Sequence, residues 1–181
     1  MTKGEELPPL TGAAAFQSQQ EDCNELNDKF EWIEQELQKL PVSSLYPTLA
    51  QNALDILKVW RQRFPKQIWI RIFRRDRVLK ELNETAPVMD YILKAVKNYS
   101  KQHDKDQITI VDLCCGFGYM SMFLAEMLDP QKVNRLVLID KQWPHHEQEQ
   151  ALPHQISDEH IRNFQWPIFL QTRKVGSVGA S

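Results

Sequence analysis

One stretch of the sequence constrains the fold more than any other, and it runs from Ile108 to Asp140. An apolar, β-branched run at 108–113 leads into a turn that contains Gly116 and Gly118. A segment with helical spacing follows, and then a second apolar run that ends in Asp140. This order predicts a β-α-β unit, in which a helix joins two parallel strands, and therefore an α/β fold.

The side chains of this unit also predict which surfaces are buried. The first strand is expected to be buried on both faces by four apolar residues, Ile108, Ile110, Val111 and Leu113. The helix is expected to stop at Asp129-Pro130 and to bury one stripe, formed by Met120, Phe123, Leu124 and Met127. Residues 136–139 then form the second strand.

Two acids stand where the two predicted strands end. Asp112 closes the first strand, and Asp140 closes the second, 22 residues after Gly118. Glycines allow the backbone to approach a ligand closely, and a helix that starts there directs its unpaired N–H groups to the same place. A nucleotide-binding unit keeps a ribose-binding carboxylate roughly 20 residues past its glycines, so the spacing indicates a nucleoside ligand.

Several kinds of site compete for this pattern. A P-loop requires Gly-Lys-Ser/Thr, and no such ending follows Gly118. A dinucleotide fingerprint requires a third glycine where Ser121 stands, and it does not call for an acid such as Asp112. A nicotinamide site and a β-α-β unit without a ligand remain as alternatives.

The run Asp-Leu-Cys-Cys-Gly-Phe-Gly-Tyr resembles motif I of class I S-adenosylmethionine-dependent methyltransferases, acid-x-Gly-x-Gly-x-Gly. Asp112 matches the acid, Gly116 and Gly118 match two glycines, and Cys114 replaces the first. The resemblance implies a Rossmann-like parallel sheet. It also implies that the acid reaches the methionine amino group, usually through water, and that Asp140 binds the ribose hydroxyls.

This resemblance gives a set of expected cofactor-binding residues and one cofactor, S-adenosyl-L-methionine. Trp143 is included because it follows the ribose-binding acid, where it is expected to stack on adenine, although packing explains it equally well. No catalytic base is predicted. The set is Asp112, Cys114, Cys115, Gly116, Phe117, Gly118, Asp140, Lys141 and Trp143.

The rest of the chain predicts four regions. Residues 1–22 hold few large apolar side chains and are expected to be disordered, as is the tail 176–181. Residues 23–100 are expected to be helical, and 101–175 to form a partial methyltransferase domain with a third strand at 168–175. The helical spacing in the second region rests on Leu26, Phe30, Ile33, Leu37 and Leu40, then on Leu49, Ala53, Ile56, Trp60 and Phe64. Thr85 is expected to cap a further helix, with Pro87 in its first turn.

Class I methyltransferases have seven strands, whereas this sequence offers three. We therefore expect a truncated form, a splice product or a fragment of a methyltransferase, of uncertain activity. The alternative is a non-catalytic binding or regulatory protein that retains half of a cofactor pocket.

RNA is the favoured methyl acceptor, and a protein or a small molecule remains as an alternative. The segment 58–81 is rich in Lys and Arg, and aromatic residues are interleaved with them, which is typical of RNA-binding surfaces. The alternative is that the rings belong to the core and the arginines coat the surface. The residues expected to contact RNA are Arg71, Arg74, Arg75 and Arg77; the interleaved rings are Trp60, Phe64, Trp69 and Phe73.

Composition excludes other classes. The chain of 181 residues is 42% hydrophobic with a net charge of −2, and no apolar run reaches the roughly 18 residues of a membrane span. No signal peptide is recognisable, so a cytoplasmic or nuclear location is expected. The adjacent Cys114 and Cys115 are expected to be small buried fillers. No metal site is expected from the histidines His145, His146, His154 and His160, because no acid or Cys stands at ligand spacing with them.

Overall fold

The structure is a computed structural model that describes residues 30–73, 77–103, 106–140 and 164–174. By their internal packing the residues divide into two units, 1–39 and 40–181. In the first unit residues 30–39 are helical, which confirms that part of the helix predicted from Cys23. The expected disordered segments 1–22 and 176–181 lie outside the described residues.

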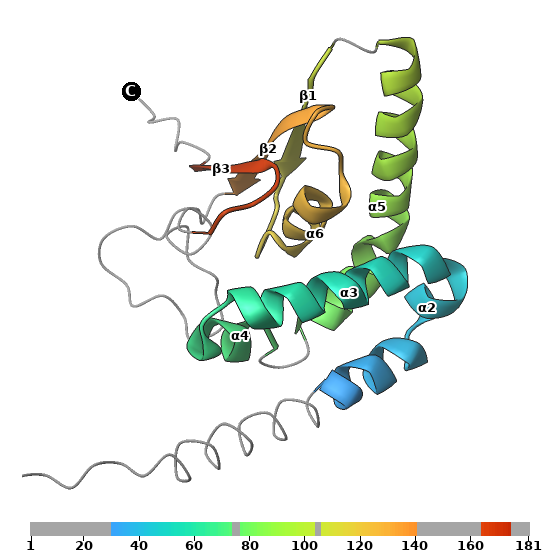
Figure 1. Ribbon diagram of the computed structural model, residues 1–181, viewed down its shortest axis with the longest axis vertical. Helices are drawn as coiled ribbons and strands as arrows, with labels where there is room; N and C mark the ends of the chain where they lie inside the picture. Colours follow the sequence, from blue (N-terminus) through green and yellow to red (C-terminus); the bar gives the residue numbers. More distant parts are fainter. Residues whose placement is uncertain (1–29, 74–76, 104–105, 141–163, 175–181) are drawn as a thin grey trace, which may run out of the picture. The chain divides into compact units, whose positions relative to one another are not determined.

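Four helices open the second unit (Figure 1): α2 Pro41–Leu45, α3 Pro47–Arg63, α4 Lys66–Phe73 and α5 Arg77–Gln102. A proline begins both α2 and α3, where its missing N–H has no helical partner to lose. None of the helices within the described ranges combines the length and the apolar character that crossing a bilayer requires.

The helix predicted over 46–64 is confirmed as α3. Leu49, Ala53 and Trp60 are buried as expected, whereas Ile56 is half-buried. The helix buries three further residues that the predicted stripe omitted, because its inward face is wider than one row of side chains. They are Ala50, Leu54 and Leu57.

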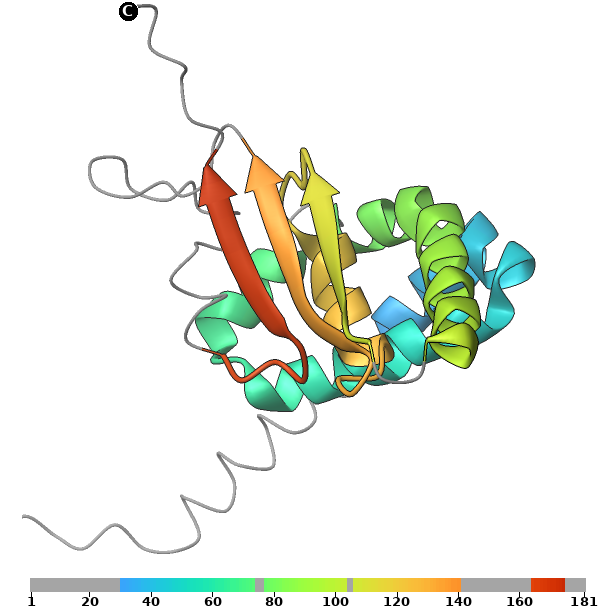
Figure 2. The same cartoon turned by 90° about the horizontal axis from the view of Figure 1, so that it is seen from above.

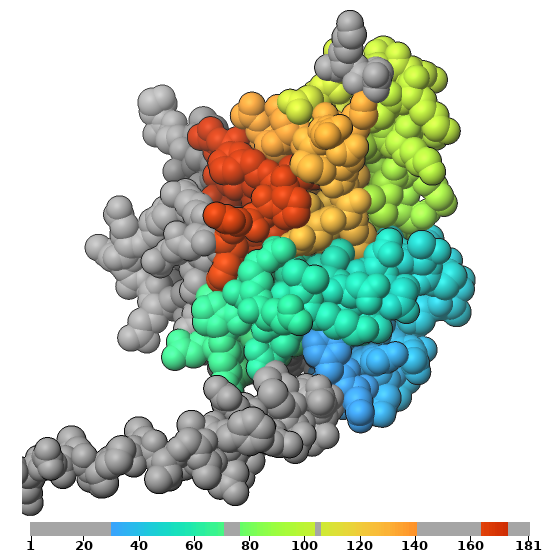
Figure 3. All heavy atoms as spheres, viewed as in Figure 1, coloured from blue at the N-terminus to red at the C-terminus, as the bar shows by residue number. Residues whose placement is uncertain are grey.

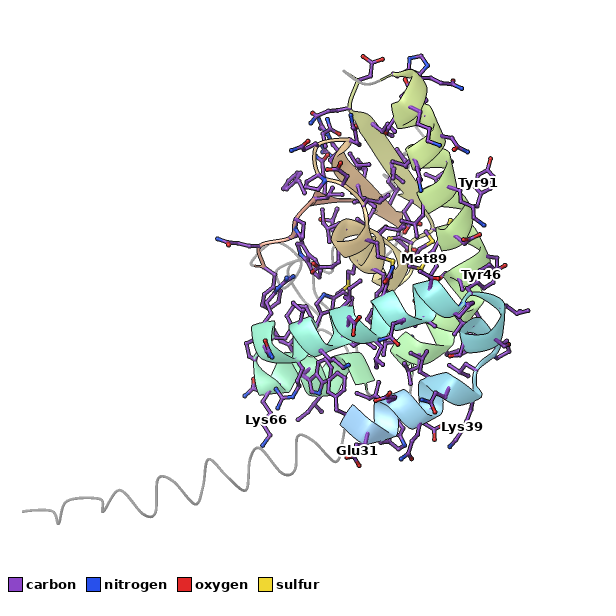
Figure 4. The ribbon with its side chains drawn as sticks, turned by 45° about the vertical axis from the view of Figure 1, so that its right-hand side comes forward. Glu31, Lys39, Tyr46, Lys66, Met89 and Tyr91 are labelled. Carbon is purple, nitrogen blue, oxygen red and sulfur yellow. The ribbon has the colours of Figure 1, made fainter. Side chains whose placement is uncertain are left out.

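The start predicted for the next helix is wrong. α5 begins at Arg77, and Thr85 lies inside it, where its Oγ1 donates a hydrogen bond of 2.7 Å to the carbonyl of Glu81. Pro87 also lies inside the helix, a position where it removes one backbone bond without ending the helix. Figure 4 shows two faces of α5, with Met89 directed inward and Tyr91 outward; Met89 is fully buried, whereas Tyr91 is exposed.

A three-stranded sheet confirms the predicted β-α-β unit and the third strand. Strand β1 spans Ile108–Leu113, helix α6 Tyr119–Met127, β2 Val133–Asp140 and β3 Phe169–Lys174. The strands are parallel, in the order β1-β2-β3. Figure 2 shows the three arrows running the same way, in front of α6 and α3. The chain is thus an α/β protein with a short parallel sheet.

Within the described residues only one face of the sheet is covered, so the expectation that β1 is buried on both faces is wrong. Asp112 points to the buried face, whereas the side chains of Val111 and Leu113 are 52% and 70% exposed. On β3, Phe169 is 62% exposed and Leu170 is buried. Figure 3 shows residues of β2 and β3 at the surface beside α3. An apolar β-branched sequence suits either strand environment, so it did not distinguish one covered face from two.

Helix α6 occupies the buried side of the sheet. Its predicted stripe is confirmed at Phe123 and Leu124, which are buried, while Met120 and Met127 are half-buried. The helix also buries Tyr119, Ser121, Met122 and Ala125. A helix enclosed on most sides has no single inward row, which is why a one-stripe pattern underestimates its burial.

Helix α6 is fixed to α3 through Trp60. The Trp60 ring stacks on Phe123 with centroids 4.8 Å apart, and its Nε1 donates a hydrogen bond of 3.1 Å to Oε1 of Glu126. The same carboxylate oxygen accepts a hydrogen bond from Arg63, which forms an ion pair with it. Glu126 therefore holds both side chains of α3 against the helix that begins at the glycine turn.

Candidate functional site

The two predicted acids lie at the carboxyl ends of neighbouring strands. Asp112 is opposite Leu138 in the β1-β2 register, so Asp140 stands two rows further, level with the turn after β1. There the Oδ2 atom of Asp140 accepts a hydrogen bond of 3.2 Å from the backbone N–H of Gly116. The structure therefore brings Asp140 to the glycine turn.

Asp112 is the buried member of the pair. Its Oδ2 accepts a hydrogen bond of 2.7 Å from Ser121 Oγ on α6. Burial raises the pKa of the Asp112 carboxyl, the hydrogen bond from Ser121 opposes that rise, and the charge of Asp140 adds to it. The two carboxylates therefore lie close enough for the charge of Asp140 to act on Asp112.

The turn between β1 and α6 passes through the left-handed region at three residues. The φ angles are 61° at Cys114, 55° at Gly116 and 78° at Gly118. A Cβ placed on Gly116 would meet no atom within 4 Å, so space is open beside its backbone. Gly118 caps the start of α6. These observations fit a turn to which a ligand has close access.

The interpretation of the two cysteines as buried fillers is wrong. Cys114 is exposed and Cys115 is half-buried. Cys114 occupies the position of the first motif glycine in a left-handed conformation, where a side chain costs about 1–2 kcal/mol. The conformation explains why glycine suits this position better.

Helix α5 contributes two residues, Arg77 and Glu81, that are not among the expected cofactor-binding residues. The guanidinium carbon of Arg77 lies 4.1 Å from the centroid of the Phe117 ring, within the glycine turn. Burial raises the pKa of Glu81 to about 7, and the charge of Asp112 contributes to that rise. The spacing of Arg77 and Glu81 places them on one helix face, but only the packing of α5 brings that face to the turn.

A hollow of about 360 Å³ opens at the start of α5, lined by Arg77, Lys80, Glu81 and Glu84. Tyr119 is fully buried, and its burial raises the pKa of its hydroxyl. The charge of Glu81 adds to this rise, and the charge of Arg77 opposes it. The electrostatic coupling runs from the hollow through Glu81 to Asp112. Glu81, which lines the hollow, therefore lies close enough to Asp112 for the two charges to interact.

The remaining predicted site residues are placed only in part. Three of the four rings in the basic segment, Trp60, Phe64 and Trp69, are buried in the core, as the alternative interpretation expected. Arg71 and Phe73 lie in α4, but their side chains are not among those that the structure describes. Arg74 and Arg75 lie outside the described residues altogether. Lys141, Trp143 and the histidines of 145–160 lie outside them as well. Among the residues that are described, no cluster of three His, Cys, Asp or Glu side chains is suited to a metal.

Comparison with protein-family models, with curated proteins and with solved structures finds no match for this chain.

Proposed function

We propose that this chain binds S-adenosylmethionine at the turn 112–118 and Asp140, and that it is an S-adenosylmethionine-dependent methyltransferase. The observation that carries the proposal is the convergence of two strand-end carboxylates on a glycine turn with open space beside Gly116. The resemblance of this turn to motif I supports the choice of cofactor.

When bound, S-adenosylmethionine supplies a methyl group that is already activated by a sulfonium, so the protein mainly has to orient the reactants. Asp140 would accept hydrogen bonds from the ribose hydroxyls while it holds the Gly116 N–H. Asp112 would bind the amino group, and the backbone of the turn would line the nucleoside. We assign no catalytic base.

The binding step is tested by calorimetric titration of the purified chain with S-adenosylmethionine and with S-adenosylhomocysteine. We expect saturable binding in the micromolar range, lost in Asp140→Ala and kept in Asp106→Ala. Asp106 is a matched control because it is an exposed acid just before β1, at the opposite end of that strand. A wild-type chain that binds neither compound would contradict the proposal.

For the acceptor we propose RNA, contacted through the arginines of 71–77. The buried rings leave phosphate contacts as the main contribution of this segment, and such contacts weaken steeply with salt. Replacement of Arg71, Arg74 and Arg75 by Gln should therefore reduce both the affinity for RNA and its dependence on salt. A control variant carries the same change at Lys94, Lys97 and Lys101, which are exposed on the far part of α5. Equal loss in the two variants would argue against an RNA site in this segment.

A non-catalytic binding protein is the second candidate. It is favoured by the exposed apolar side chains of Val111, Leu113 and Phe169 on the open face of the sheet, since such surfaces often contact other proteins. The two candidates differ in one measurement. Transfer of radioactive methyl from bound S-adenosylmethionine to RNA supports the enzyme, whereas binding without transfer to RNA, protein or small acceptors supports the second candidate.

A further inference from the structure

A hollow of about 620 Å³ lies beside the last turns of α5, and we call it the α5–α6 hollow. Its volume falls within the range of about 300–1,000 Å³ that is usual for small-molecule sites. One wall is α5, and the other is the end of α6 with the turn that leads into β2. Along α5, Lys97 in this wall stands about 30 Å from Arg77, at about 1.5 Å per residue. The α5–α6 hollow is therefore separate from the glycine turn.

The walls of the α5–α6 hollow are apolar. Helix α5 contributes Leu93 and Val96, which stand three residues apart on one helix face, and the end of α6 contributes Met127 and Leu128. Val96 and Leu128 are buried, whereas Leu93 and Met127 are half-buried and keep part of their surface open to a ligand. Covering that surface with a hydrocarbon contributes roughly 25 cal/mol for each Å² removed from water. The walls therefore favour a ligand with an apolar body.

Lysines surround these apolar walls. Lys97 and Lys101 line the hollow from α5, and Lys132 lines it from the turn before β2. Among the described lining residues the one acid is Asp129, whose Oδ1 accepts a hydrogen bond of 2.8 Å from the backbone N–H of Gln131. Within the described part of the chain, Lys97 and Lys101 form no ion pair, so their charges are open to a ligand. Three cations against one engaged acid favour an anionic head group.

Ser100 adds a buried hydroxyl to the α5 wall, one helical turn after Val96. Its Oγ atom is shielded from water, and it has no hydrogen-bond partner among the residues that the structure describes. A buried hydroxyl without a partner costs about 1–3 kcal/mol. An oxygen of an anionic ligand in the hollow would accept the hydrogen bond that this hydroxyl lacks there.

We propose that the α5–α6 hollow binds a fatty carboxylate. Its hydrocarbon chain would pack on the apolar side chains of both walls. Its carboxylate would lie between Lys97 and Lys101, which stand one helical turn apart, and next to the Ser100 hydroxyl. A nucleic acid strand would use the lysines and leave the apolar walls uncovered, whereas a neutral lipid would cover the walls and leave the lysines without an anion. The proposal does not depend on S-adenosylmethionine.

The test uses the whole chain and a dansyl-labelled undecanoate, a fatty carboxylate whose fluorescence rises in apolar surroundings. We expect saturable binding, with displacement by decanoate about tenfold stronger than by decanol, which lacks the charge. Lys97→Gln combined with Lys101→Gln should weaken probe binding about fivefold or more. Ser100→Phe, which places a ring in the hollow, should abolish it. The control, Lys58→Gln combined with Lys94→Gln, removes the same charge from exposed ion pairs outside the hollow and should leave the affinity within about twofold.

Several results would overturn the proposal: no saturable binding, equal displacement by decanoate and decanol, or equal loss in the lysine variant and its control. Displacement of the probe by an RNA oligonucleotide would also overturn it, because it would assign the lysines to nucleic acid. Thermal unfolding shows whether each variant is folded. The lysine variant changes only exposed side chains, so it decides the question even if Ser100→Phe does not fold. Because S-adenosylmethionine is absent from this experiment, its failure would leave the proposed function standing.

Discussion

The carboxylate of Asp140, at the end of β2, accepts a hydrogen bond from the backbone N–H of Gly116 in the turn that follows β1. One side chain therefore shapes the turn and faces the space in front of it. The two roles can be separated by substitution.

Asp140→Asn keeps an oxygen that can accept from Gly116 but loses the negative charge. We expect the free energy of unfolding to change by less than about 0.5 kcal/mol, whereas Asp140→Ala lowers it by about 1 kcal/mol. Both variants should bind S-adenosylmethionine more weakly. Urea unfolding and calorimetry measure the two effects, and equal destabilisation by Asn and Ala would show that the bond to Gly116 does not support the turn.

Ser121→Ala removes the hydrogen-bond donor of the buried Asp112. The pKa of Asp112 should rise further, because the donor stabilises its ionised form. We expect a loss of about 1–3 kcal/mol in unfolding free energy, larger at about pH 8 than at about pH 5, since the ionised acid needs the donor most. Urea unfolding at both pH values measures this. Ser44→Ala, which removes an exposed hydroxyl bonded to the Pro41 carbonyl, is the control and should change little at either pH.

Glu81 predicts a pH dependence of stability. Its pKa is raised from 4.5 to about 7 in the folded chain, chiefly by burial. The charges of Glu84 and Asp112 add to the rise in pKa, and those of Arg77 and Lys80 oppose it. The folded state then binds more protons, so this contribution to stability is present below about pH 4.5 and is lost as pH rises through about 7. Glu81→Gln should remove this pH dependence of the unfolding free energy. Its size is on the order of 1 kcal/mol, because Glu81 is half-buried and solvent screens part of the effect.

Urea unfolding at several pH values between about 4 and 8 measures that slope. Asp55→Asn is the control, because it removes an exposed acid whose charge is not among those that shift the pKa of Glu81. A wild-type slope that survives in Glu81→Gln would assign the pH dependence to another group.

Cys114→Gly should stabilise the chain. A residue with a side chain costs about 1–2 kcal/mol in the left-handed backbone conformation. The greater conformational freedom of glycine in the unfolded chain offsets about 0.5–1 kcal/mol of the gain in stability. Cys114→Val should be destabilising, since β-branched residues fit this conformation poorly. Thermal unfolding ranks the three proteins, and a glycine variant less stable than the valine variant would refute the argument. In a background with Cys23→Ser and Cys115→Ser, bound S-adenosylmethionine should also slow the labelling of Cys114 by a maleimide.

The sequence predicted the β-α-β unit correctly because its order depends on local pattern: two apolar runs, a glycine turn and a helical segment between them. It failed at the start of α5, where Thr85 and Pro87 have the composition of a helix beginning although they lie within the helix. Local preference was overridden there by the apolar face that continues back to Val78, which is buried in the fold.

The candidate site was predictable to the extent that it lies on the strand ends. Asp112 and Asp140 follow from the rule that parallel strands present their carboxyl ends at one edge. Arg77 and Glu81 reach the site only through the packing of α5, which no spacing in the sequence encodes. The exposed face of β1 was missed for a related reason, since Val111 and Leu113 are equally apolar whether a layer covers them or not.

Helix α6 has nine residues and is therefore only about 13 Å long. Ser121 near its start bonds to Asp112, and Glu126 near its end holds Trp60 and Arg63 of α3. A helix this short moves as one rigid body, so a displacement of Glu126 at one end also displaces Ser121 at the other. Loss of the Trp60 anchor on α3 should therefore also weaken the proposed ligand binding at the glycine turn, which Trp60 does not contact.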